Sequence, residues 1–247
     1  MKRVFPILVA LTAGLLAYAF YEAMWVAPTE RTMGDVQRIF YYHVPSAWTA
    51  FILFFVNLVA SVAYLIRRNP KADALAAVSA EVGVVFCTVV LVTGPIWARP
   101  VWGIWWTWDI RLTTTLVLWL IYVSYLVLRR FSDSAQTPKL AAVLAIFGAL
   151  DVPLVYFSIW FFRTQHPQPV IGGGGSIDPR MLHVLLINWL AFSCLAFVLC
   201  WARYHVEQLN RQYEESLALE SLMADSVSTS HRRQGGANPD RAKKAAS

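Results

Sequence analysis

Charged residues are scarce in this sequence. Asp, Glu, Lys and Arg together make up 15% of its 247 residues, whereas a soluble domain carries about 25%. Hydrophobic residues make up 57%, and the mean hydropathy is +0.50. This balance excludes an ordinary soluble globular domain and indicates a protein embedded in a membrane.

Cysteines and nucleotide-binding motifs are equally sparse. The three cysteines, Cys87, Cys194 and Cys200, show no metal-ligand spacing and form neither CxxC nor CxxCH, so we interpret them as small buried residues. The sequence has no Rossmann glycine pattern and no phosphate-binding loop of the form GxxxxGK followed by Ser or Thr. Any ATP that drives the work of this protein must therefore be hydrolysed by another chain.

Long apolar runs are what the sequence does contain. A bilayer core about 30 Å thick needs roughly 20 apolar residues per helix. Six such runs are present, and the predicted spans are residues 5–26, 47–66, 75–96, 112–128, 140–162 and 182–202. The sequence therefore predicts an all-α polytopic membrane protein with six transmembrane helices in residues 1–207. Residues 208–247 are predicted to form a polar tail that is a short helix and then disordered.

Positive charges predict how the chain is oriented. With the N-terminus in the cytoplasm, 15 of the 21 Lys and Arg residues fall on the cytoplasmic side, and the outer loops hold six arginines and no lysine. Cytoplasmic loops of membrane proteins carry such an excess. We therefore expect both termini to be cytoplasmic. We interpret the net charge of +6 as an attraction to the anionic lipid bilayer, and we expect no nucleic-acid partner.

The first apolar run could also be a secretory signal. A short basic segment precedes it, and Ala-Tyr-Ala at residues 17–19 resembles a cleavage site. We favour a retained helix, because the apolar run continues to Val26 and because its removal would leave an odd number of helices.

Several residues inside or between the spans depart from a plain apolar pattern. Glu81 and Asp151 lie deep in predicted spans, where a charge costs several kcal/mol unless it is paired, so they mark interior or interface positions. Pro153 predicts a kink in the fifth helix. The run Gly172 to Gly175 has the composition of a linker.

The densest signal is a tryptophan-rich loop over residues 97–113. Four of the 11 tryptophans fall within seven residues: Trp102, Trp105, Trp106 and Trp108. If the segment is helical, the first three form one aromatic face, which is a platform for a flat apolar ligand. An aromatic belt at the membrane interface explains one or two tryptophans. A belt does not explain four tryptophans in one short segment with Asp109 and Arg111, so we favour a binding platform for a flat ligand.

The segment WGIWWTWD over residues 102–109 resembles the tryptophan-rich WWD domain of the haem-handling proteins of cytochrome c biogenesis. In haem lyases and synthetases, the Trp-Asp pair of this motif is followed by proline and then glutamate. The continuation WDIRLT at residues 108–113 instead resembles the haem exporter protein C branch, the CcmC family, and the resemblance covers nearly the whole chain. It implies that the WWD loop lies on the periplasmic face, between the third and fourth helices.

The resemblance also implies two axial ligands for the haem iron. The family carries one histidine before its second span and one before its last, and the matching positions are His43 and His183. A planar macrocycle over an aromatic surface needs ligands that approach from opposite faces, and two imidazoles from separate loops can supply them. His166 is a rival ligand in a proline-rich loop, whereas His205 and His231 lie on the predicted cytoplasmic side.

Haem carries two propionates, which call for fixed cations. The permanently charged fork of arginine suits them. Arg38 and Arg111 are the best-placed candidates to bind the propionates, and Arg99 and Arg180 are the second choices. Asp109 could pair with Arg111, or Arg111 could face the ligand.

The function that the resemblance implies is haem delivery. Members of the family bind haem b at the periplasmic face of the bacterial inner membrane and deliver it to the haem chaperone CcmE. They work with the ABC transporter subunits CcmA and CcmB and the small membrane subunit CcmD. We expect the chain not to be an enzyme, because its outer loops offer no pair of nucleophile and base.

Two other functions stay open at this point. The first is a haem lyase or synthetase component that attaches haem to apocytochrome c, against which the missing proline and glutamate after Asp109 argue. The second is a quinol-linked electron carrier with haem b. Its histidine ligands would lie inside the helices, whereas His43 and His183 are predicted at helix mouths.

Overall fold

The computed structural model describes residues 3–132, 134–162, 164–168 and 177–235. Most of these residues are helical, and no strand is found among them. The elements in chain order are α1 Val4–Tyr21, η1 Glu22–Val26, η2 Asp35–Ile39, α2 Phe40–Arg67, α3 Pro70–Trp102, α4 Ile110–Phe131, α5 Thr137–Ala149, α6 Asp151–Phe161 and α7 Pro179–Gly235.

The chain divides into two compact units, Met1–Tyr204 and His205–Ser247. Six helical segments are long and apolar enough to cross a membrane: Val4–Val26, Asp35–Arg67, Pro70–Trp102, Ile110–Phe131, Thr137–Phe161 and Pro179–Ala224. The predicted all-α fold with six spans is therefore confirmed.

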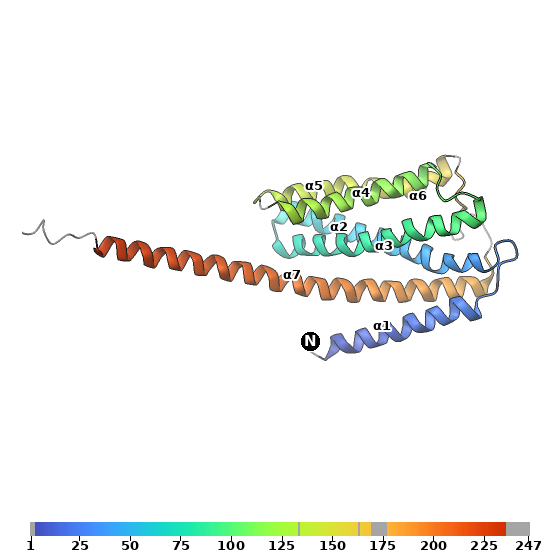
Figure 1. The fold of residues 1–247 in the computed structure, drawn as a ribbon, viewed down its shortest axis with the longest axis horizontal. Helices are drawn as coiled ribbons and strands as arrows, with labels where there is room; N and C mark the ends of the chain where they lie inside the picture. The colour runs from blue at the N-terminus through green and yellow to red at the C-terminus, as the bar shows by residue number, and fades with distance from the viewer. Residues whose placement is uncertain (1–2, 133, 163, 169–176, 236–247) are drawn as a thin grey trace, which may run out of the picture. The chain divides into compact units, whose positions relative to one another are not determined.

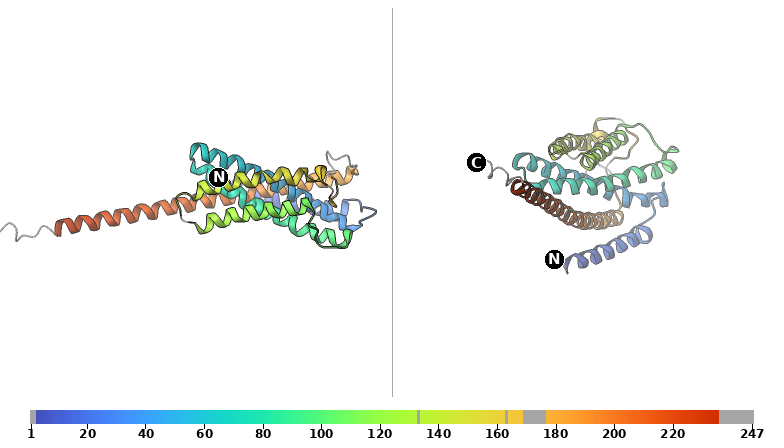
Figure 2. Two further views of the ribbon diagram at one scale, coloured as in Figure 1. Left: turned by 90° about the horizontal axis from the view of Figure 1, so that it is seen from above. Right: turned by 60° about the vertical axis from the view of Figure 1, so that its left-hand side comes forward.

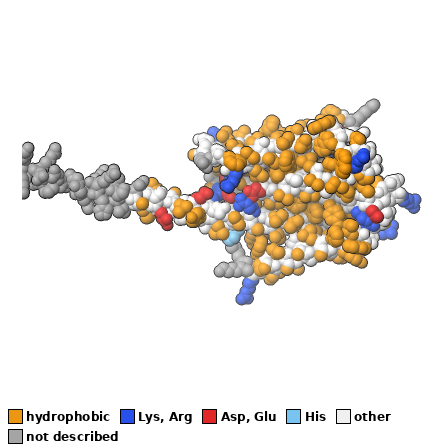
Figure 3. All heavy atoms as spheres, in the orientation of Figure 1, with side chains coloured by type: hydrophobic (Ala, Val, Ile, Leu, Met, Phe, Trp, Pro, Cys, Tyr) orange, Lys and Arg blue, Asp and Glu red, His pale blue; other side chains and the backbone are white. Residues whose placement is uncertain are grey.

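The first unit is arranged around α2 and α3, which lie side by side (Figure 1). Helices α4, α5 and α6 cover one side of this pair, and α7 and α1 lie on the other side, as the second view also shows (Figure 2). The visible face of the unit carries apolar side chains over its middle, with charged side chains towards its two ends (Figure 3). This is the surface that a bilayer requires.

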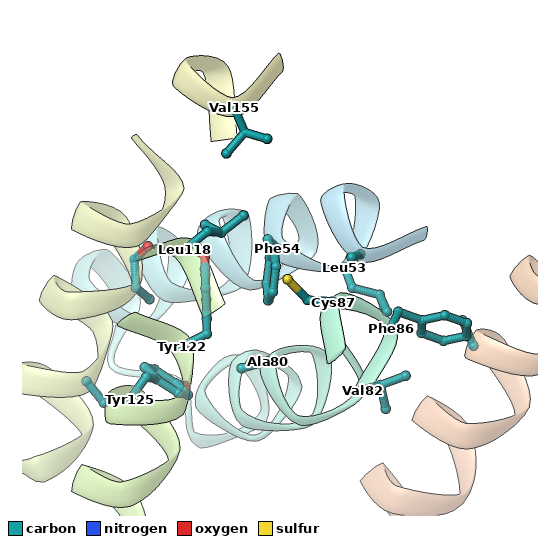
Figure 4. Close-up of a cluster of buried hydrophobic side chains, with 14 residues drawn as sticks. Leu53, Phe54, Ala80, Val82, Phe86, Cys87, Leu118, Tyr122, Tyr125 and Val155 are labelled. Atoms are coloured by element: carbon teal, nitrogen blue, oxygen red, sulfur yellow. Dashed lines mark hydrogen bonds between the residues drawn. The ribbon is translucent and has the colours of Figure 1, made fainter. Parts of the chain in front are cut away.

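The core lies where α2, α3 and α4 meet (Figure 4). Phe54 of α2 stacks on Tyr122 of α4 with the ring centroids 3.9 Å apart, and both side chains are fully buried. Gly83 of α3 faces the same ring, because a Cβ atom at position 83 would lie 2.7 Å from Cε1 of Phe54. The missing side chain therefore allows α2 and α3 to approach closely.

Helix α1 contacts the rest of its unit sparsely. Only Thr12 and Ala19 of its residues are buried. Its polar link to the bundle is Asn188 of α7, a buried side chain that donates a hydrogen bond to the Ala19 carbonyl oxygen at 3.2 Å. Most of α1 is thus left to contact lipid.

The fifth span is broken between α5 and α6. Helix α5 ends at Ala149 and α6 begins at Asp151, with Leu150 between them. Pro153 has no N–H to donate to the Ala149 carbonyl four residues earlier, so the break lies where a proline-induced kink is expected. The predicted kink is confirmed.

The two acids within the spans have different surroundings. Glu81 accepts a hydrogen bond from Nη2 of Arg203 at 2.9 Å, which links α3 to α7. Asp151 is 8% exposed, and its Oδ2 has no hydrogen-bond partner in the described part of the chain. A third acid, Asp73 of α3, accepts hydrogen bonds of 2.7 and 2.9 Å from Arg129 of α4.

Three boundaries differ most from those predicted. Helix α2 begins at Phe40, before the predicted span 47–66, so His43 lies in a helix and not in the preceding loop. Helix α3 continues through Trp102, so the first residues of the predicted loop 97–113 are helical. Helix α7 continues to Gly235, so the tail after residue 208 is helical for much longer than the short helix we expected. The linker predicted at Gly172 to Gly175 lies outside the described residues.

Candidate functional site

Three connections gather at one end of the first unit (Figure 1). They are residues 27–39, residues 103–109 and residues 164–168, the last being a described part of the connection between α6 and α7. The opposite end carries the N-terminus and the α2–α3 and α4–α5 connections. We call the first of these ends the long-loop end, and every predicted site residue belongs to a segment at this end.

The tryptophans do not form the single helical face that we considered. Helix α3 stops because Gly103 takes a left-handed conformation with φ of +81°, which glycine adopts readily. Trp102 ends the helix and packs edge to face on Trp97, with ring centroids 5.2 Å apart. Trp106 and Trp108 form a second edge-to-face pair at 5.9 Å. The aromatic surface is therefore built from two ring pairs in different backbone conformations.

Two of the four tryptophans remain largely exposed. Trp105 is 58% exposed and Trp108 is 77% exposed. Exposed indole rings at the end of an apolar bundle offer flat apolar area with little conformational freedom to lose on binding. They can accept a planar ligand, and they leave its outer edge open.

Asp109 fixes the end of this loop with both of its carboxylate oxygens. Oδ1 caps α4 by accepting hydrogen bonds from the backbone N–H of Arg111 at 2.9 Å and of Leu112 at 3.3 Å. Oδ2 accepts a hydrogen bond from the backbone N–H of Gln165 at 3.0 Å. Asp109 therefore ties the tryptophan loop to the segment that carries His166.

His43 lies in the first turn of α2, half-buried against α3. Its Nδ1 is 2.8 Å from Oγ1 of Thr93, and a Cβ atom at position 94 would lie 3.5 Å from its Cε1. The imidazole thus lies against α3 at the level of Thr93 and Gly94. Thr93 is a contact that the sequence did not reveal, because the two residues are 50 positions apart.

His166 is also half-buried, and it lies outside the membrane spans. Its Nδ1 is 2.9 Å from the carbonyl oxygen of Pro167, which can only accept a hydrogen bond, so Nδ1 carries the proton and Nε2 keeps its lone pair. Burial, and to a smaller extent the nearby Arg111 guanidinium, lowers the pKa of His166 from the ordinary 6.5 to about 4. The imidazole is therefore neutral at physiological pH, which is the form that binds metal.

His43, His166 and Arg111 lie in one neighbourhood, near enough for a charge on Arg111 to act on either imidazole. Nη1 of Arg111 is buried and has no hydrogen-bond acceptor among the described residues, and Nε1 of Trp106 is in the same situation. Buried donors without acceptors at one end of the bundle are suited to hold the carboxylates of a ligand.

His183 is placed differently. It is exposed near the start of α7, and its neighbours Val184 and Leu185 pack in a buried cluster with Tyr41 of α2. Tyr41 and His43 are two residues apart on a helix, which places their side chains on nearly opposite faces of α2. Phe40, Tyr42 and Val44 also pack against this cluster, so the start of α7 contacts the first turns of α2, the part of the helix that carries His43.

The Arg38 guanidinium makes its hydrogen bonds within the connection between the first and second spans and the end of the first span. Nη1 donates hydrogen bonds to the carbonyl oxygens of Ala23 at 2.7 Å and Ala27 at 3.4 Å. Nε donates to Asp35 at 3.1 Å, and Nη2 donates to Thr29 at 3.3 Å. These contacts fasten the connection between the first and second spans, so the geometry favours a structural task for Arg38 over a propionate contact.

The two arginines predicted as second choices for the propionates also have partners within the protein. Arg99 donates a hydrogen bond to the Gly103 carbonyl oxygen, where it caps the end of α3. Arg180 forms an exposed ion pair with Asp178, with Nη2 and Oδ2 3.0 Å apart. Among the predicted cations, Arg111 is the one with a buried donor free of contacts within the described residues.

The arrangement fits a planar iron ligand with acidic side groups. Two neutral imidazoles can supply axial nitrogens, the exposed indole rings can support the ring plane, and Arg111 can meet a carboxylate. Together the fold and this end of the bundle define a class: a multi-pass membrane protein whose candidate binding groups lie at one end of its helices.

Comparison with known proteins identifies the family within this class. Residues 1–219 match the haem exporter protein C family, CcmC, and the chain belongs to that family. Haem exporter protein C of Bradyrhizobium diazoefficiens is 35% identical over 97% of this chain and 91% of its own length. The Escherichia coli K12 protein of the same name is 35% identical over 68% of each chain. A ccmC-like mitochondrial protein of Marchantia polymorpha, named for cytochrome c biosynthesis, is 32% identical over 78% of this chain and 83% of its own length.

Proposed function

We propose that this chain binds haem at the outer face of the inner membrane and delivers it to the haem chaperone CcmE during cytochrome c maturation. The observation that carries the proposal is the presence of two buried donors without acceptors among the described residues, Nη1 of Arg111 and Nε1 of Trp106, at the same end as the exposed rings of Trp105 and Trp108. The names of the relatives, which refer to haem export and cytochrome c biosynthesis, agree with this reading.

Haem b is the form we propose as cargo, with its iron held between two imidazoles. Two nitrogens that bind one iron atom are only two bond lengths apart, so their residues must approach the same point from opposite sides. His166 lies in the same neighbourhood as His43, and His183 starts a helix that packs on the first turns of α2. We propose His183, which the family resemblance implies, as the second ligand, and His166 is the rival that the same test separates from it.

The rest of the cargo is proposed to contact the tryptophan loop and Arg111. Trp105 and Trp108 offer exposed rings to the porphyrin plane, and the pair formed by Trp106 and Trp108 extends that surface. Arg111 suits a propionate, because a permanently charged guanidinium with a buried free donor gains most from a carboxylate partner. Asp109 supports the site indirectly, through the α4 cap and Gln165.

The proposed partner proteins are inferred from two features: the absence of a nucleotide-binding motif in this sequence and the exposed aromatic surface of the site. Its sequence has no nucleotide-binding motif, so we propose that CcmA and CcmB supply ATP hydrolysis and that CcmD completes the complex. A shallow aromatic surface leaves one edge of the haem accessible to CcmE. We further propose that the chain is not an enzyme, since handing over a bound cargo asks for no bond-making residue of its own.

The two alternatives are less well supported. A lyase of this superfamily would carry proline and glutamate after Asp109, where this chain has isoleucine and arginine. A quinol-linked carrier would bury its ligands between helices, whereas His43 lies in the first turn of α2 and His183 lies near the start of α7. Both imidazoles thus lie at the end of the bundle, where a cargo can leave.

The proposal is tested by coexpressing the chain with CcmA, CcmB, CcmD and CcmE and measuring the haem bound covalently to CcmE. We expect haem-loaded CcmE with the wild type and with the control His205→Ala, and its loss with His43→Ala. Equal loading with His43→Ala would contradict the proposal. Coexpression with an apocytochrome c and no CcmE tests the lyase alternative, which alone predicts a haem-bearing cytochrome.

A further inference from the structure

The hydroxyl of Thr93 has two partners that fix the position of its single proton. Oγ1 lies 2.7 Å from the carbonyl oxygen of Val89, one turn earlier in α3, and 2.8 Å from Nδ1 of His43. A carbonyl oxygen can only accept, so a hydroxyl proton directed at Val89 leaves Oγ1 as the acceptor for His43. In this arrangement the Nδ1 atom of His43 carries a proton and donates to Oγ1.

This arrangement selects one tautomer of His43. A neutral imidazole has one N–H, so a proton on Nδ1 leaves Nε2 with a free lone pair. We propose that Thr93 is a positioning residue that holds the His43 ring and its tautomer so that Nε2 binds the iron of the cargo. The inference rests on the proposed function, because it assumes that His43 is an iron ligand.

A second threonine on the same helix shows that such a hydroxyl acts as an acceptor. Thr88 donates to the Val84 carbonyl oxygen at 2.7 Å, and Nε1 of Trp119 lies 2.8 Å from its Oγ1. An indole N–H can only donate, so Thr88 must accept from Trp119. Thr93 has the same geometry with an imidazole in place of the indole.

The chemical benefit lies in the basicity of the ligand. A histidine that donates its other N–H to a fixed acceptor has its ring orientation set and its ligating nitrogen made more basic. Loss of such an acceptor typically weakens metal affinity about 10- to 100-fold. His166 donates its Nδ1 proton to Pro167, so this rival ligand presents Nε2 in the same manner.

The test uses four variants of the purified full chain in detergent: Thr93→Val, Thr93→Ser, Thr88→Val and His43→Ala. Valine keeps the shape of threonine and removes the hydroxyl, whereas serine keeps the hydroxyl. Ferric haem is titrated into each apoprotein, and resonance Raman spectra of the reduced complexes report the iron–imidazole stretch. Thr88→Val serves as the matched control, because it removes the same hydrogen-bond geometry from the same helix.

We expect Thr93→Val to bind haem about 10- to 100-fold more weakly and to lower the iron–imidazole stretching frequency. Thr93→Ser and Thr88→Val should match the wild type in both measurements. An unchanged Thr93→Val, or equal losses in Thr93→Val and Thr88→Val, would overturn the role of Thr93 while His43→Ala still loses binding. If His43→Ala itself binds like the wild type, the proposed ligand fails instead.

Discussion

The two carboxylate oxygens of Asp109 serve separate partners. Oδ1 caps α4 through Arg111 and Leu112, and Oδ2 holds the backbone of Gln165, next to His166. Asp178 performs the first of these tasks before α7, where its Oδ1 accepts from the backbone N–H of Arg180 at 2.8 Å. Beyond the cap, Asp109 adds the contact to Gln165, whereas Asp178 adds an exposed ion pair with Arg180, so variants of the two aspartates compare the Gln165 contact with a surface ion pair.

Asp109→Asn is expected to keep the cap and lose the second contact. The amide oxygen can still accept from the start of α4, but an amide nitrogen facing Gln165 cannot accept from its N–H. A hydrogen bond to a charged group is worth about 1.5–3 kcal/mol, so haem affinity should fall roughly tenfold or more. Haem titration of Asp109→Asn and the control Asp178→Asn measures this, and equal affinities for the two variants would contradict it.

Single residues were the hardest part to predict from the sequence. Asp109 and Arg111 follow from the WWD motif and His43 from the family's histidine before the second span, and all three belong to segments at the long-loop end. The choice between His166 and His183 depends on which face of α2 each connection meets, and helix packing sets that face. The contact between His43 and Thr93 joins two helices across 50 residues, so no local pattern records it.

At the scale of single helices, the closest approach in the core depends on one glycine. A Cβ atom at position 83 would lie 2.7 Å from Cε1 of Phe54, whose ring is held by its stack on Tyr122. At Gly14 of α1, in contrast, a Cβ atom would meet nothing within 4 Å. The two glycines therefore form a matched pair inside transmembrane helices.

Gly83→Ala should lower the free energy of unfolding by about 1–3 kcal/mol, because overpacking forces α2 and α3 apart. Gly14→Ala should be neutral or stabilise by about 0.5–1 kcal/mol, because alanine is the better helix former. Thermal unfolding of both variants in the same detergent compares them. A Gly83→Ala protein as stable as the wild type would show that the helices adjust freely at this contact.

The existence of the helices was predictable, and their ends were not. Length and apolar composition alone predict six spans, because a bilayer fixes how many apolar residues a helix needs. The ends depend on caps: Gly103 stops α3 after Trp102, and Asp109 starts α4. Both are ordinary capping residues, but the apolar run ends earlier, near the charged Arg99, and so predicts too short a helix.

At the scale of the whole molecule, the orientation in the membrane is still a prediction. The excess of Lys and Arg in alternate connections predicts that both termini are cytoplasmic and that the long-loop end is outside. Gly34 lies in the connection between the first and second spans, with no atom within 4 Å of its Cβ position. It is therefore a suitable place to insert a reporter.

Alkaline phosphatase, which is active only outside the cytoplasm, should be active when inserted at Gly34 and inactive when fused after Ser247. Green fluorescent protein should show the opposite pattern, with fluorescence from the C-terminal fusion. The reverse result for both reporters would place the tryptophan loop in the cytoplasm and would remove the basis for delivery to a periplasmic chaperone.

The most direct test of the account is the absorption spectrum of the purified chain with bound haem, recorded for the wild type, His43→Ala, His166→Ala and His183→Ala. Two axial imidazoles give a characteristic Soret band, which weakens or shifts when either ligand is lost. We predict this change for His43→Ala and for His183→Ala, and an unaltered spectrum for His166→Ala. An unaltered spectrum for both His43→Ala and His183→Ala would contradict the site described here, and a change in His166→Ala in place of His183→Ala would move the second ligand to His166.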